Sequence, residues 1–91
     1  MIEEKINKDM SLYVANILGI DFSKFTLDDF NRGMNIELEH GKQNPMTNVT
    51  NDDLIATAKI ALAHLNEFPN YYNKDYGLQH FENFLKSTLN N

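Results

Sequence analysis

Apolar residues recur at intervals of three and four along most of the chain, which is the spacing of one face of an α-helix. No segment shows the period-two alternation of a half-buried strand. Glycine, proline and capping residues divide the pattern into four helices: one ending at Gly19, one over 26–41, one over roughly 53–68 and one over roughly 71–89. We therefore expect an all-α protein, a compact bundle of about four helices with short connections and no β-sheet, with residues 1–91 forming a single helical domain.

Residues that commonly cap helices stand where the second and third helices are expected to begin. Thr26 and Asp29 resemble a capping box, in which each side chain accepts a hydrogen bond from the other residue's backbone. The third helix has four neighbouring candidates, and the sequence leaves the choice open: Thr50, Asn51, Asp52 and Asp53. Gly33 lies inside the second helix at a cost of up to about 1 kcal/mol, which indicates that another helix approaches closely there.

Composition narrows the classes of function. The chain has no cysteine, so disulfides, thiolate metal sites and cysteine nucleophiles are excluded. Its net charge is −5, and its eight Lys and Arg residues form no basic stripe, so we expect no nucleic-acid binding. No apolar stretch approaches the roughly 18 residues of a membrane span, and the N-terminus lacks the pattern of a secretory signal. We expect a cytoplasmic protein with no membrane partner.

Two tetrapeptides carry the main candidate chemistry. "ELEH" places Glu37 three residues before His40, and "HLNE" places His64 three residues before Glu67. Each pair borders the apolar face of its helix. If the second and third helices run antiparallel, as short loops favour, the four side chains converge between them.

Three interpretations of these four residues stay open. They could form a buried network of Glu–His hydrogen bonds or ion pairs, which is the leading one because a buried carboxylate needs partners. They could hold a divalent cation such as zinc, manganese or iron. They could also be exposed and unrelated. We therefore expect no cofactor, with a divalent metal as the alternative.

Neither catalysis nor a partner surface is marked by a strong motif. There is no nucleophile at suitable spacing and no glycine-rich phosphate loop, so we expect no enzymatic activity. In "EFPNYY", Phe68, Tyr71 and Tyr72 surround a Pro-Asn turn. These aromatic side chains either fold onto the core or form a patch that binds a protein partner.

Three motifs in order resemble a known family: "FTLDDFNRGMNIELEHG", "TNVTNDD" and "KIALAHLNEFPNYY". They are similar to a small domain of unknown function found in bacteria, their phages and mobile elements. The resemblance implies no reaction, but it does imply these signature positions: Glu37, Glu39, His40, Gly41, Asn48, Thr50, Asp52, Asp53, His64 and Glu67.

Together these observations favour a non-catalytic, acidic accessory protein of a phage, mobile element or bacterium that acts through protein–protein contacts. The alternative is a metal-binding domain that uses the Glu/His residues between helices two and three and could support hydrolysis.

Overall fold

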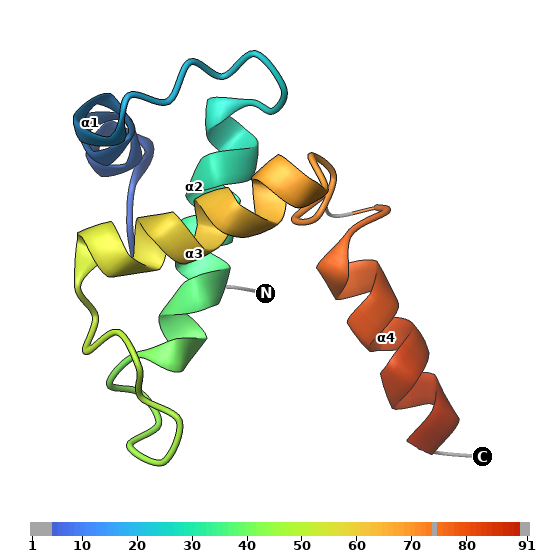
Figure 1. The fold of residues 1–91 in the computed structure, drawn as a ribbon. Coiled ribbons are helices and arrows are strands. Elements are labelled where there is room, and N and C mark those ends of the chain that lie inside the picture. Colours follow the sequence, from blue (N-terminus) through green and yellow to red (C-terminus); the bar gives the residue numbers. More distant parts are fainter. Residues whose placement is uncertain (1–4, 74, 90–91) are drawn as a thin grey trace.

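The computed structural model describes residues 5–73 and 75–89. Its elements follow in chain order: α1 (Lys8–Leu18), α2 (Leu27–Glu37), the 3₁₀ turn η1 (Leu38–His40), α3 (Leu54–Glu67) and α4 (Leu78–Leu89) (Figure 1). The described residues contain no strand. The predicted all-α class and the four helices are confirmed. No helix in this part of the chain is long and apolar enough to cross a membrane.

Helix boundaries follow from local chemistry. α1 ends at Gly19, whose left-handed φ of 73° suits glycine. Thr26 caps α2 in a capping box with Asp29, and both backbone-to-side-chain distances are 3.1 Å. Asp53 is the N-cap of α3 and accepts a hydrogen bond from the Ala56 backbone N–H at 2.8 Å.

Two of the other three cap candidates, Thr50 and Asp52, organise the loop before α3. The Thr50 hydroxyl accepts from the Asp52 backbone N–H at 3.3 Å. The Asp52 carboxylate accepts from the Lys42 backbone N–H at 2.9 Å. It therefore ties the end of the loop to its beginning, close against Gly41.

The expected start of the last helix near Tyr71 is wrong. Residues 69–73 and 75–77 are not helical, the Leu78 backbone N–H donates to the Tyr71 carbonyl, and α4 begins only at Leu78. Tyr71 and Tyr72 fit the helical spacing of apolar residues in the sequence, but both lie in the turns before α4, which is why the predicted helix began too early.

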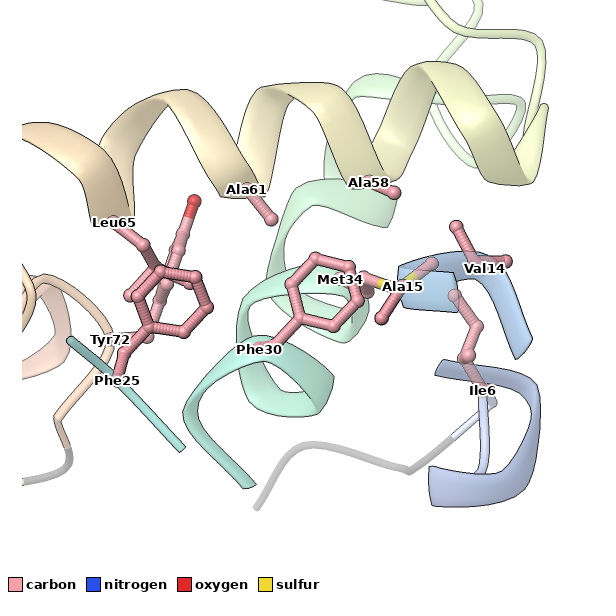
Figure 2. Packing of buried hydrophobic residues seen from close by; sticks show 10 residues of the cluster. All are labelled: Ile6, Val14, Ala15, Phe25, Phe30, Met34, Ala58, Ala61, Leu65 and Tyr72. Carbon is pink, nitrogen blue, oxygen red and sulfur yellow. The ribbon is translucent and has the colours of Figure 1, made fainter. Parts of the chain in front are cut away.

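Three helices share the core. α2 packs against both α1 and α3, and Figure 2 shows Phe30 and Met34 of α2 beneath Ala58 and Ala61 of α3. These small alanine side chains let α3 come close to α2. The buried hydrophobic residues are Ile6, Val14, Ala15, Phe25, Phe30, Met34, Ala58, Ala61, Leu65 and Tyr72.

The relation between α2 and α3 differs from the antiparallel arrangement that the sequence favoured. α3 crosses α2 instead of lying alongside it (Figure 1). The connection over residues 41–53 is long enough to let the chain change direction.

α4 stands apart from the packed helices (Figure 1). None of its residues is buried, although half-buried Leu78 packs against the core. Large apolar side chains are therefore left exposed along α4: Phe81, Phe84, Leu85 and Leu89.

Candidate functional site

A buried carboxylate stands at the C-terminal end of α2. Glu37 is the last residue of that helix and only 2% exposed. The Tyr72 hydroxyl donates to its Oε2 at 2.5 Å, and His64 Nδ1 lies 3.2 Å from the same oxygen. Because an unpaired buried carboxylate is very unfavourable, Tyr72 and His64 are needed to stabilise Glu37 in its buried position.

The hydrogen-bond geometry fixes where the proton on His64 resides. Tyr72 has one hydroxyl proton, and it donates that proton to Glu37. His64 Nδ1 lies 2.7 Å from the same hydroxyl oxygen, so Nδ1 must carry a proton and donate it. Burial, and then the bond to Glu37, raise the pKa of Tyr72 well above its ordinary value, which keeps the hydroxyl protonated.

Aromatic packing positions the ring of Tyr72. A Cβ added at Gly33 would lie 2.6 Å from two of its ring carbons, so the ring rests directly on the α2 backbone. The close approach predicted at Gly33 is therefore made by a tyrosine side chain and not by another helix. Beside it, Tyr71 stacks on the ring of His64 with centroids 4.3 Å apart.

A second histidine approaches Glu37 from η1. The 3₁₀ turn brings His40 Nε2 to 3.5 Å from Glu37 Oε1 and 3.3 Å from Glu39 Oε1. Burial raises the pKa of Glu39, with a smaller contribution from the negative charge of Glu37 and opposition from nearby His40. One ligand atom from each of the three residues lies within 4.8 Å of the others.

With this geometry in view, comparison with known proteins gives a family. Residues 11–83 match the family model described as "Protein of unknown function (DUF5661)". This chain belongs to the DUF5661 family. The match includes α1 from Ser11 onward, the whole Glu37 cluster and the first half of α4. Neither curated proteins nor solved structures gave a match. The resemblance to a small domain of unknown function is confirmed at this level.

In this DUF5661 protein, three of the four predicted site residues come together and the fourth does not. Glu37, His40 and His64 form the cluster, whereas Glu67 is exposed and has no part in the interactions described there. Because α3 crosses α2, His64 reaches the buried carboxylate, while Glu67, the last residue of α3, stays exposed.

Sequence reasoning missed two members of the cluster. Tyr72 was considered only as a core or partner-binding aromatic residue, and Glu39 only as a signature position. Tyr72 is 1% exposed, so its ring is not available to a partner. Tyr71 is half-buried, and Phe68 is exposed. No local signal pointed to Tyr72, because its partner Glu37 lies 35 residues earlier in the chain.

Proposed function

We propose that this DUF5661 protein is a non-catalytic accessory protein that binds another protein through α4. The observation that carries the proposal is the exposure of large apolar side chains on a helix with no buried residue. Phe81 is 57% exposed and Phe84 60%. Contiguous apolar surface of this kind marks interaction sites on small proteins.

The apolar residues of α4 lie on one side of the helix. Phe81, Phe84 and Leu85 are three and four residues apart, so their side chains share a face. Gln79 and Asn83 lie opposite and line a cavity of about 340 Å³ beside α2. The apolar face of α4 is thus left largely uncovered.

An apolar groove at the start of α4 extends this face. It has a volume of about 420 Å³ and includes the side chains of Phe68, Tyr71, Tyr76, Leu78 and Phe81. Phe81 belongs to both surfaces, so the groove and the helix face are continuous. Two residues that the sequence suggested for partner binding, Phe68 and Tyr71, line this groove.

The shape of the surface favours a helical partner. α4 has 12 residues and is therefore about 18 Å long, enough for two to three turns of an opposing amphipathic helix. Exposed aromatic side chains supply the anchors that dominate such interfaces. The net charge of −5 favours a partner with basic residues around its apolar stripe. The resemblance to a domain of bacteria, phages and mobile elements suggests that the partner comes from the same cell or element.

Site-specific photo-crosslinking in the native host tests the proposal. A photoreactive phenylalanine analogue at Phe84 should capture a defined partner, whereas the same analogue at Asn83, on the opposite face of α4, should not. With the analogue at Phe84, Phe81→Ser combined with Leu85→Ser should abolish capture without lowering the melting temperature, because neither side chain is in the core. Equal capture from both positions, or no capture from Phe84, would overturn the proposal.

A further inference from the structure

We propose that Glu37, Glu39 and His40 form a binding site for a divalent first-row metal cation, with zinc as the best match. This proposal does not depend on protein binding through α4. It also differs from the metal site that the sequence suggested, because Glu39 replaces Glu67 and His64 supports the site without being a ligand.

Both distances from His40 to the carboxylates fit a metal better than they fit direct hydrogen bonds. Zinc lies about 2.0–2.1 Å from nitrogen and oxygen ligands in a tetrahedral arrangement, which places ligand atoms about 3.3–3.4 Å from one another. His40 Nε2 lies 3.3 Å from Glu39 Oε1 and 3.5 Å from Glu37 Oε1. Charge-assisted N–H···O bonds are shorter, at about 2.7–2.9 Å.

The hydrogen bonds around Glu37 leave one of its two carboxylate oxygens, Oε1, available to bind a metal ion. Its Oε2 is bound by Tyr72 and His64, which fixes the carboxylate in its buried position. Its Oε1 is aimed at His40 and accepts none of the hydrogen bonds described for residues 5–73 and 75–89. In metal sites, hydrogen bonds commonly hold the carboxylate oxygen that does not bind the metal.

Charge and access also favour a cation. Two carboxylates face one imidazole, so even a protonated His40 leaves one negative charge in excess. The side chains of Glu39 and His40 are 49% and 43% exposed, so both can adjust to an ion and water can complete its coordination. Three protein ligands and an open fourth position facing solvent are typical of sites at which zinc exchanges or activates a water.

Imidazole and carboxylate ligands without thiolate suit zinc, manganese and iron(II). Cobalt(II) can take the place of zinc as a probe, because its visible absorption depends on the coordination geometry. The test uses the full chain without a histidine tag, freed of metal by a chelator. Titration with Zn²⁺ should give one site per chain and a higher melting temperature, and Co²⁺ should give the absorption of a four- or five-coordinate ion.

The variants separate this site from general attraction to an acidic protein. Glu39→Gln and His40→Gln should each weaken Zn²⁺ binding at least tenfold and abolish the Co²⁺ absorption, while circular dichroism shows the helices intact. Glu67→Gln changes the same kind of side chain on an exposed position away from the cluster and should leave the affinity within twofold. Equal effects of Glu39→Gln and Glu67→Gln, or no saturable binding in the wild type, would overturn the proposal.

Discussion

The hydroxyl of Tyr72 is a single group whose removal tests how the buried carboxylate is held. Tyr72→Phe keeps the ring that covers Gly33 and removes only the oxygen that donates to Glu37 at 2.5 Å. Because the two rings have nearly the same shape, the change isolates the polar contribution from the packing.

The expected loss follows from the partners of that hydroxyl. A hydrogen bond to a charged group contributes about 1.5–3 kcal/mol, and Glu37 is too buried for water to replace the lost donor freely. His64 keeps its contact of 3.2 Å with Glu37, so the variant should lose little of the stabilisation that His64 provides. We expect the free energy of unfolding to fall by about 1.5–3 kcal/mol. For a domain of this size, that corresponds to roughly 6–24 °C in the melting temperature.

Urea and thermal unfolding followed by circular dichroism measure this loss, with Tyr71→Phe as the matched control. The Tyr71 ring stacks on His64, but its hydroxyl makes none of the hydrogen bonds found in the described part of the chain. Its removal should therefore change stability by less than about 0.5 kcal/mol. If the two variants unfold alike, the Tyr72 hydroxyl does not stabilise Glu37 and the reasoning is refuted.

Two further predictions concern the same region. Gly33→Ala should destabilise the protein by about 1 kcal/mol or more in urea unfolding, because overpacking against the Tyr72 ring outweighs the gain in helix propensity; a more stable variant would show that the ring moves aside freely. The raised pKa values of Tyr71 and Tyr72 predict full stability below about pH 10 and a decline above it, since these tyrosines ionise at a lower pH in the unfolded chain than in the folded one. Between about pH 8 and about pH 11, the free energy of unfolding should fall less steeply with pH for Tyr72→Phe than for the wild type. An equal slope in both proteins would contradict the raised pKa of Tyr72.

Features that depend on neighbouring residues could be predicted from the sequence. The capping box of Thr26 and Asp29 needs only residues three apart, and the end of α1 needs only the left-handed conformation that Gly19 adopts easily. The apolar spacing likewise identified all four helices, because the apolar residues of each helix gather on one face and therefore recur every three or four positions.

Features that depend on tertiary contacts could not be predicted in this way. Tyr71 and Tyr72 have helical spacing, yet Tyr72 leaves the helical path to reach Glu37, far away in the sequence. The direction of α3 was misjudged because the loop before it is long enough to turn the chain. That direction decides which side chains reach Glu37: it brings His64 to the carboxylate and leaves Glu67 outside.

The separation of α4 from the core has a consequence for how members of this family can diverge. Leu78 joins α4 to the packed body, and the other side chains of the helix add almost nothing to the core. Substitutions along its outer face can therefore accumulate with little effect on folding. If α4 binds a partner as proposed, selection could exchange one partner for another in this segment while α1, α2 and α3 keep the same packing.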